Sequence, residues 1–573
     1  MENIEIARIF EEVADLLEID GANPFRVRAY RNAARTVQSQ SLPVTALLAR
    51  EGEEALEELP GIGEDLAGKI REIVETGELT LLRELREKTP PGVAELMHLP
   101  GLGPKRARQL YHELGIQSLD QLEKAAREER LREIHGIGPK LEQKILQGIA
   151  EQRARGGRFK LAEADAYIRP FLEHLREAPG IQALEVAGSY RRRRETVGDV
   201  DLLVTARNSA PIADRFVSYP EVAEVLAHGE TKCSVRLKSR LQVDLRIVPQ
   251  ASFGAALHYF TGSKAHNIAV RTLGVKRKLK INEYGVFRGS RRVGGATEDE
   301  VFKAVGLPWI PPELREDRGE IDAAAAGRLP ELIELDDIRG DLQMHTKYTD
   351  GKNTLKEMAE ACRDHGYDYL AITDHSKAVR VAGGLEPAEF RKQFREIERV
   401  QKELDGITIL KGAEVDILDD GELDLDDDTL AEFDVVVVSV HSKFNLSQSA
   451  MTKRIVRALR NPHVHILGHP TGRILGRREP YPLDLEEIVK TAREQNVALE
   501  VNAQPDRLDL NDLHVQMARD AGVKLVISTD AHRIEELDYM RYGVDQARRG
   551  WCEASDILNT LPRTRFLQAI RKG

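Results

Sequence analysis

The chain has 573 residues, too many for one hydrophobic core, and so indicates several domains. No apolar run approaches a membrane span, the start lacks a signal-peptide pattern, and the three cysteines (Cys233, Cys362, Cys552) lie far apart. This excludes a disulfide framework and a thiolate zinc site and fits a reducing cytosol. The net charge of −11 argues against a nucleic-acid binder, but residues 101–300 hold 35 Lys and Arg against 25 Asp and Glu, so one basic face stays open as a hypothesis beside chance clustering.

The first 155 residues indicate helices separated by short glycine turns. Three turns, at 59–63, 99–105 and 134–140, share the pattern apolar-x-Gly-apolar-Gly, and each precedes a helix bearing Lys or Arg. Such glycines let the backbone approach a phosphate, and the N–H groups at a helix start bind the anion without contacting bases. One turn would be an ordinary helix break, but three resemble the helix-hairpin-helix motif. The predicted DNA contacts are Gly61, Gly63, Gly101, Gly103, Lys105, Gly136, Gly138 and Lys140.

Residues 180–250 change to strand patterns, which predict a mixed sheet with helices. The run 188–204 places a Gly-Ser turn and four arginines before Asp199 and Asp201. Residues i and i+2 of a strand share a face, so both carboxylates project together while Val200 packs behind them. Paired carboxylates hold cations of the Mg²⁺ type, which neutralise a phosphoryl group in transfer. Asp-x-Asp alone is more often a solvated strand, but the preceding turn offers N–H groups and a hydroxyl to phosphate. The strand patterns are 183–187, 201–205, 234–237 and 241–248.

A third carboxylate and an aromatic turn complete this constellation. Asp244 lies in the strand pattern 241–248, and three converging acids are hard to keep ionised without a cation. Downstream, residues 259–263 read Tyr-Phe-Thr-Gly-Ser and are followed by Asn267 and Arg271. By itself, that segment would be an aromatic core pair and a turn.

Together these motifs closely resemble the DNA polymerase X family, the group that contains DNA polymerase β, over residues 1–317. The resemblance implies a template-directed polymerase that fills short gaps in DNA repair with dNTPs and Mg²⁺ or Mn²⁺. It implies that Asp199 and Asp201 bind both metals, and that Asp244 binds the catalytic metal and helps to activate the primer 3′-hydroxyl. The implied nucleotide-binding positions are Gly188, Ser189, Arg192, Gly198, Tyr259, Phe260, Gly262, Asn267 and Arg271.

The resemblance also points to Lys69, where the family can carry a lysine that forms a Schiff base with a 5′-deoxyribose phosphate. Such a lysine must be partly deprotonated. Asp65 stands one turn earlier, where a carboxylate would favour the charged form. A solvated or phosphate-contacting lysine is therefore preferred over a strong lyase.

From residue 338 short apolar strands alternate with helices, which predicts an α/β barrel. The preceding residues 318–337 are small and acidic and predict a linker with some helix. Acids and histidines follow the strands, and strand ends converge on one face of such a barrel. Imidazole and carboxylate suit Zn²⁺ or Mn²⁺, and so many at strand ends are not explained as ordinary core or loop residues. The strand patterns are 369–373, 407–410, 435–440, 464–467, 498–501 and 523–528.

These residues resemble the PHP (polymerase and histidinol phosphatase) domain, a metal-dependent phosphoesterase, over residues 338–573. The resemblance implies up to three metals, Zn²⁺ or Mn²⁺ or both. The usual His-x-His opening begins here with Gln343, whose neutral amide implies a loosely held first metal, or Mn²⁺ in preference to Zn²⁺. Arg473 is expected to contact phosphate. The implied ligands are His345, Glu414 and Asp530 for the first metal, Asp350, His375 and His532 for the second, and Glu414, His441 and His469 for the third.

The implied activity of this region is a 3′→5′ exonuclease, cleavage at abasic sites or removal of 3′-phosphates, and the sequence does not choose among them. Two alternatives stay open: a PHP nuclease that uses the polymerase region as a DNA-binding platform, and a polymerase with a catalytically weak PHP scaffold. The pairing of domains implies a bacterial cytoplasm, with DNA 3′ ends and dNTPs as partners, and a monomer is expected.

The predicted fold is multidomain, with a helical helix-hairpin-helix region, an α+β nucleotidyltransferase palm and a distorted, TIM-like α/β PHP barrel. The expected domains are a lyase-like helical DNA-binding domain at 1–82, a helix-hairpin-helix domain at 83–155, the palm at 156–250, a nucleotide-selecting subdomain at 251–317, the linker at 318–337 and the PHP phosphoesterase at 338–573.

Overall fold

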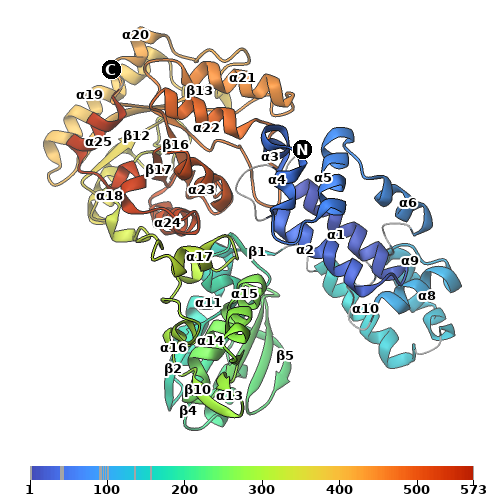
Figure 1. Ribbon diagram of the computed structural model, residues 1–573. Helices are drawn as coiled ribbons and strands as arrows, with labels where there is room; N and C mark the ends of the chain where they lie inside the picture. Colours follow the sequence, from blue (N-terminus) through green and yellow to red (C-terminus); the bar gives the residue numbers. More distant parts are fainter. Residues whose placement is uncertain are drawn as a thin grey trace. The chain divides into compact units, whose positions relative to one another are not determined.

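The computed structural model describes residues 3–38, 44–89, 93, 96, 99, 102–134, 137–154 and 158–571 (Figure 1). The chain divides into two compact units, Met1–Arg158 and Phe159–Gly573. Two of the predicted DNA-contacting glycines, Gly101 and Gly136, lie outside the described residues. Among the helices that are described, none is long and apolar enough to cross a membrane.

The first unit is helical where it is described, as the glycine-separated pattern predicts. Apolar residues three and four apart, such as Ile6, Phe10 and Val13 in the first helix, turn one face into the core. The Tyr30 ring meets Phe10 edge-on, with 5.6 Å between centroids. The helices are α1 (Asn3–Ile19), α2 (Pro24–Gln38), α3 (Val44–Glu51), α4 (Glu53–Glu57), α5 (Glu64–Thr76), α6 (Thr80–Lys88), α8 (Pro104–Leu114), α9 (Leu119–Arg127), η1 (Arg130–Glu133) and α10 (Pro139–Ala154).

Each glycine turn buries its middle residue and leaves its second glycine exposed. Ile62, Leu102 and Ile137 are buried in the helical core and anchor the three turns. The glycines that follow them directly precede α5, α8 and α10, and a Cβ atom on any of the three would meet nothing within 4 Å. Because the first N–H groups of a helix have no partner within it, these helix starts stand open to an anion.

The second unit begins with a five-stranded mixed sheet in the order β2-β4-β7-β6-β5, and β4 and β7 are parallel neighbours. Helices α11 (Leu161–Arg176) and α13 (Ala210–Val217) share its buried core through residues such as Phe171 and Phe216. The strands are β2 (Ile181–Val186), β4 (Asp199–Ala206), β5 (Val222–His228), β6 (Lys232–Leu237) and β7 (Gln242–Ile247), and the short β1 (Phe159–Lys160) pairs with β3 (Thr196–Val197).

A smaller three-stranded sheet follows, in the order β10-β9-β8, beside a helical layer. Its strands are β8 (Lys280–Asn282), β9 (Gly285–Arg288) and β10 (Arg291–Gly294), and the helices are α14 (Phe253–Thr261), α15 (Lys264–Lys276) and α16 (Glu298–Ala304). Segment 318–337 then contains α17 (Glu320–Ala325) and η4 (Leu335–Asp337). Ala323, Ala324 and Leu332 of this segment join the apolar core of the small sheet, so the predicted linker is packed inside the second unit.

A buried charged cluster fixes the start of α16. The Arg315 side chain is fully buried, and its Nη1 atom lies 2.6 Å from Glu298 Oε1. Arg191 donates to both carboxylate oxygens of Glu298 at 2.8 Å. Burial alone would raise the pKa of Glu298, but the two arginines lower it well below its usual range.

We therefore expect Arg315→Ala to lower the free energy of unfolding of the second unit by about 3 kcal/mol, because it leaves a buried carboxylate only partly paired. Urea unfolding of the full chain measures the change. Lys303→Ala is the control, because Lys303 forms an exposed ion pair with Asp299 on the same helix and should change stability by less than about 0.5 kcal/mol. Equal stability of the Arg315→Ala protein and the unmodified chain would contradict a stabilising role.

The remainder of the second unit is a seven-stranded parallel sheet in the strict order β11 to β17. A parallel bridge between Met344 and Ala531 joins the segments that follow β11 and β17, so the sheet is a nearly closed barrel. Tyr369, Val437 and Val526 are in the core inside the barrel, which also includes Phe566 of the last helix, and other helices pack outside it (Figure 1). The strands are β11 (Gly340–Asp341), β12 (Tyr369–Ile372), β13 (Thr408–Asp416), β14 (Val435–Ser439), β15 (Ile466–Leu467), β16 (Ala498–Asn502) and β17 (Leu525–Ser528). The helices are α18 (Leu355–Asp364), α19 (Pro387–Glu403), α20 (Asp427–Leu430), α21 (Gln448–Leu459), α22 (Leu485–Glu494), α23 (Asp512–Asp520), α24 (Met540–Arg549) and α25 (Arg563–Ile570).

Candidate active sites

The three predicted aspartates come together on two neighbouring parallel strands. Asp199 and Asp201 are two residues apart on β4, and Val200 between them is fully buried. Asp201 stands directly opposite Asp244 of β7 in the register of the sheet. The structure thus brings together the carboxylates that the sequence predicted to share one face.

The environment of these carboxylates suits a divalent cation. Burial, together with the charges of Asp199 and Asp244, raises the pKa of Asp201 to about 7. Asp244 is held by the Ser234 hydroxyl, which donates to Oδ1, and by the Gln242 amide at 3.3 Å. Like charges so close together are stabilised by a cation between them, and oxygen donors are what Mg²⁺ or Mn²⁺ prefers.

Two glycines allow the neighbouring loops to approach this site. Gly188 has φ +67°, and a Cβ atom there would lie 2.9 Å from Asp201 Oδ2. Gly262 has φ +69°, and its Cβ would lie 3.0 Å from Arg192 Nη1. Either position would be strained with a larger residue. Ser189 lies in α12 (Gly188–Arg191), immediately after the first of these glycines.

The predicted aromatic residues and the two polar residues that follow them are held by contacts within the polymerase region. Tyr259 is 37% exposed, and the Arg246 guanidinium lies 4.2 Å from the centre of the Phe260 ring. Asn267 Nδ2 donates to the Tyr259 carbonyl at 2.7 Å, and the Arg271 Nε atom donates to the Asn267 carbonyl. Arg271 is exposed. Gly198 lies between β3 and β4, beside Asp199.

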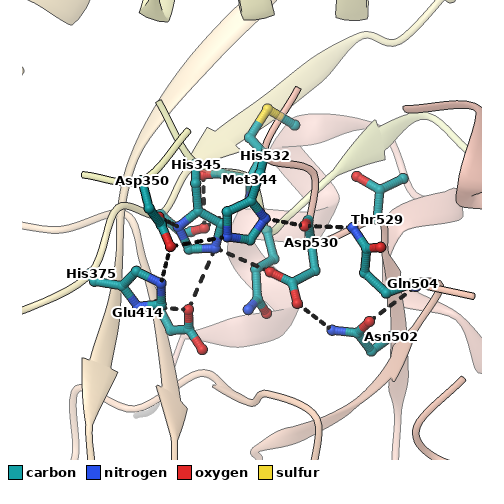
Figure 2. Close-up of polar contacts among 12 residues, drawn as sticks. Met344, His345, Asp350, His375, Glu414, Asn502, Gln504, Thr529, Asp530 and His532 are labelled. Carbon is teal, nitrogen blue, oxygen red and sulfur yellow. Dashed lines mark hydrogen bonds and ion pairs between the residues drawn. The ribbon is translucent and has the colours of Figure 1, made fainter. Parts of the chain in front are cut away.

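The predicted metal ligands of the barrel gather at the ends of its parallel strands (Figure 2). Seven of them form three groups in which each residue offers one ligand atom within 4.8 Å of the others, and His469 belongs to none of these groups. The groups are His345, Asp350, His375 and His532, then His375, Glu414 and His441, and then His345, Glu414 and Asp530.

Glu414, near the end of β13, connects these groups. Its Oε2 atom lies 3.1 Å from His375 Nδ1 and 3.5 Å from His345 Nε2. Its Oε1 atom lies 3.2 Å from His441 Nε2 and 3.0 Å from His469 Nε2. The group predicted to hold the first metal also includes Asp530, whose Oδ1 atom lies 3.1 Å from His345 Nε2.

The donor atoms fit metal ions better than they fit one another. His345 Nδ1, His375 Nδ1 and Asp350 Oδ1 are buried without a hydrogen-bond partner among the described residues. Burial lowers the pKa of His375 to about 4, so its ring is neutral and its lone pair is available to a metal. Gln343 is also fully buried, and neither atom of its amide has a partner in the part of the chain that the structure describes.

Comparison with known proteins connects these sites to a family. Family models match in the order of the chain: a helix-hairpin-helix domain at 1–79, a SAM-like helix-hairpin-helix tandem at 93–151, the DNA polymerase beta palm at 160–248, the DNA polymerase beta thumb at 256–316 and a PHP domain at 341–504. A DNA polymerase/3′-5′ exonuclease PolX of Bacillus subtilis (strain 168) is 41% identical over 98% of this chain and 97% of its own length. The chain belongs to the DNA polymerase X family. Its carboxy-terminal region is a PHP domain, so both expected resemblances are confirmed.

More distant relatives match the parts of this polymerase X chain separately. DNA polymerase lambda of Rattus norvegicus is 28% identical over 55% of this chain and 56% of its own length. A probable phosphatase of Thermoanaerobacter sp. (strain X514) is 30% identical over 31% of this chain and 73% of its own length. The predicted fold class, with a helical region, an α+β palm and an α/β PHP barrel, is confirmed. Divalent metals are the general cofactors of such domains, and DNA and nucleotides are the substrates that they imply.

Several polar residues support the ligands of this family member and were not predicted. Asp416 accepts from the His441 ring at 3.1 Å, and Asn502 Nδ2 donates to Asp530 Oδ2 at 3.1 Å. Glu500 accepts from the His469 backbone N–H at 2.6 Å. Asp416 follows Glu414 by two residues on β13, so the strand period could have identified it.

Other polar residues of the two units pair with protein groups. Asp341 accepts from Thr529 and Asp374 accepts from the Thr346 hydroxyl at 2.6 Å, so both support loops and neither joins a metal group. Arg473 is buried, and its guanidinium donates to Glu195 at 2.7 Å and to the Leu508 carbonyl, and its phosphate contact stays a prediction. In the first unit, the Lys69 ammonium is paired with Asp65 on the same helix. The lyase role of Lys69 stays a prediction.

Proposed function

We propose that this chain is a template-directed DNA polymerase that fills short gaps during repair and processes DNA 3′ ends at a second site in the PHP barrel. The observation that supports it most strongly is the convergence of Asp199, Asp201 and Asp244, in the same unit as the histidine and carboxylate groups of the barrel. Gapped or primed DNA and dNTPs are the proposed substrates. The monomeric state and the bacterial cytoplasm stay predictions.

In the polymerase site, the three aspartates would hold two Mg²⁺ or Mn²⁺ ions, which neutralise the triphosphate and lower the pKa of the attacking hydroxyl when bound. Asp244 would orient the primer 3′-hydroxyl, with its carboxylate held by Ser234 and Gln242. Ser189 and Arg192 would hold the phosphates, and Gly188 and Gly262 would allow close backbone approach. Tyr259 and Phe260 would contact the incoming sugar, Asn267 and Arg271 would contact the nascent pair and template, and Gly198 would leave room for the nucleotide beside Asp199.

In the PHP site, Zn²⁺ or Mn²⁺ held by the histidine and carboxylate groups would supply Lewis-acid activation of a phosphodiester. Glu414 connects the groups, while Asp416 and Asn502 orient His441 and Asp530. Exonucleolytic removal of a 3′ nucleotide is the activity proposed first. Cleavage at abasic sites also breaks a phosphodiester, whereas removal of a 3′-phosphate breaks a phosphomonoester. Each is read out with the same enzyme on a different oligonucleotide.

Gln343 gives a specific prediction about metal affinity. Its amide is buried and has no hydrogen-bond partner among the described residues. A neutral amide oxygen holds a first-row metal more weakly than an imidazole does. We expect Gln343→His to raise Zn²⁺ affinity by about tenfold, within the range that single residues around metal sites contribute. Metal analysis after dialysis against graded chelator measures it. Gln401→His on the outer helix α19 is the control, and an unchanged Zn²⁺ content in the Gln343→His protein would show that position 343 lies away from the metal.

A mixture of a primed, gapped duplex, dNTPs and Mg²⁺ or Mn²⁺ tests the polymerase proposal, and a labelled single-stranded oligonucleotide tests the nuclease. If the purified chain degrades the oligonucleotide but never extends the primer, the platform alternative is favoured. If it extends the primer but never degrades DNA, the weak-scaffold alternative is favoured. The intact aspartate trio argues against the first, and the three groups of possible metal ligands argue against the second.

A further inference from the structure

The segment that carries the predicted phosphate ligands of the polymerase site contacts the PHP region. Segment 188–195, which carries Ser189 and Arg192, belongs to the same compact unit as α24 of the PHP region and contacts it. Arg193 Nε lies 3.6 Å from Asp545 Oδ1 of α24. At the far end of the segment, the Glu195 carboxylate accepts from Arg473, in the loop that follows His469.

A shared carboxylate extends this contact to the middle of the segment. The Tyr190 hydroxyl donates to Asp165 Oδ1, and the Tyr542 hydroxyl of α24 donates to Asp165 Oδ2 at 3.1 Å. Leu508 and Tyr542 of the PHP region also belong to the apolar core of the palm. The segment therefore contacts the PHP region directly through Arg193 and Glu195, and Tyr190 is joined to it through Asp165.

Arg549, at the end of α24, makes the most direct contact with a predicted phosphate ligand. Its side chain is 3% exposed, and its Nη1 atom donates to the backbone carbonyl of Arg192 at 2.6 Å. The same guanidinium lies 3.1 Å from Glu316 Oε1 and 2.5 Å from Asp512 Oδ2. One PHP side chain thus holds the backbone of Arg192 and contacts the carboxylate that Arg192 uses.

Glu316 forms an ion pair with the Arg192 side chain, which is predicted to bind the nucleotide. Arg192 Nε lies 3.0 Å from Glu316 Oε1, and its Nη1 atom donates to the Thr261 carbonyl. Burial would raise the pKa of Glu316, but Arg549 and Arg192 lower it to about 2, so it is charged. A charged carboxylate beside a triphosphate repels it unless cations compensate. Besides Arg192 itself, Arg549 of the PHP region and Arg194, whose Nη1 atom lies 3.7 Å from Glu316 Oε1, supply that compensation.

We propose that Arg549 is a positioning residue of the polymerase site, which fixes the Arg192 backbone and neutralises Glu316 so that the Arg192 guanidinium can bind the nucleotide triphosphate. This inference rests on the proposed role of Arg192 in nucleotide binding. The PHP domain then contributes to the affinity of the polymerase site for dNTP independently of its own metal ligands.

The test replaces Arg549 by Met, which keeps most of the side-chain volume but removes the charge and the donors. We expect the KM for dNTP in single-nucleotide insertion on a gapped duplex to rise by about five- to tenfold, the range typical of a coupling contact, with kcat within about twofold. Arg549→Lys keeps the charge and one donor and should restore part of the KM. Degradation of a single-stranded oligonucleotide should change by less than about twofold, because Arg549 is not a member of the ligand groups.

Arg519→Met on α23 is the matched control, because Arg519 pairs with Asp520 and Asp556 inside the PHP region. It should leave the KM for dNTP unchanged. The proposal is overturned if Arg549→Met has the KM of the unmodified chain. It is also overturned if polymerase and nuclease activity fall together with the unfolding midpoint, since that would be general loss of structure. Failure of the unmodified chain to extend the primer would overturn the proposed polymerase function and this inference with it.

Discussion

Replacing Asp244 by Asn is expected to lower nucleotide addition by about 10³-fold while leaving DNA degradation within about twofold. The side chain keeps its size, but the charge that stands opposite Asp201 in the sheet is lost, and with it the oxygen proposed to orient the primer hydroxyl. Single-turnover extension of a gapped duplex under saturating dNTP measures the chemical step. If the charge of Asp244 acts in the chemical step, kcat should fall by a larger factor than the affinity for DNA.

The matched control for this change is Asp214→Asn on α13. Asp214 is exposed and contacts His228 on the same palm, so its replacement should leave extension unchanged. Ser234→Ala should have an intermediate effect of about tenfold, because it removes one hydrogen bond that fixes Asp244. Extension by Asp244→Asn at the rate of the unmodified chain would remove Asp244 from the catalytic group.

Replacing Glu414 by Gln is expected to lower metal-dependent DNA degradation by more than about 100-fold, with primer extension unchanged. Residues behind metal ligands contribute about 10- to 100-fold, and Glu414 contacts four histidines directly. The amide keeps the shape of the side chain but loses the negative charge that balances the metals. Degradation of a labelled single-stranded oligonucleotide in Mn²⁺ and total bound metal are the two measurements.

Glu432→Gln provides the control in the same barrel, because Glu432 pairs with Arg391 at the surface. Its nuclease activity and metal content should match those of the unmodified chain. If Glu414→Gln loses bound metal but still degrades DNA, the nuclease lies outside the PHP groups. If it keeps both, Glu414 is not a ligand.

The strands that carry the sites could be predicted because their buried patterns are local. The buried valines of β14 and the alternation of Asp199, Val200 and Asp201 are strand signals whatever their neighbours. β5 was not predicted, because its Ala, Glu and Leu residues favour helix and its side chains are mostly exposed. Pairing with β6 overrides that preference. Residues 318–337 were predicted to be a linker because they are small and acidic. In the structure, Ala323 and Ala324 pack into the core of the small sheet, where small side chains let the helix approach closely.

The ligand types could be predicted, but their partners could not. Histidines and acids after strands must meet at one end of a parallel barrel, and His345, Glu414 and Asp530 do so. Arg473 and Arg549 are different, because a sequence shows an arginine without showing which carboxylate it pairs with. Glu195 and Glu316 lie more than 200 residues from these arginines, and only the fold brings each pair together.

We expect two chemically separate sites on one chain to act on the same DNA 3′ end. A time course on one gapped duplex with a mismatched 3′ nucleotide tests this, comparing the unmodified chain, Asp244→Asn and Glu414→Gln with dNTPs, Mg²⁺ and Mn²⁺ present. Asp244→Asn should show shortening without extension, Glu414→Gln should show no shortening, and the unmodified chain should show both processes. Loss of both processes in either variant, or of neither, would contradict it.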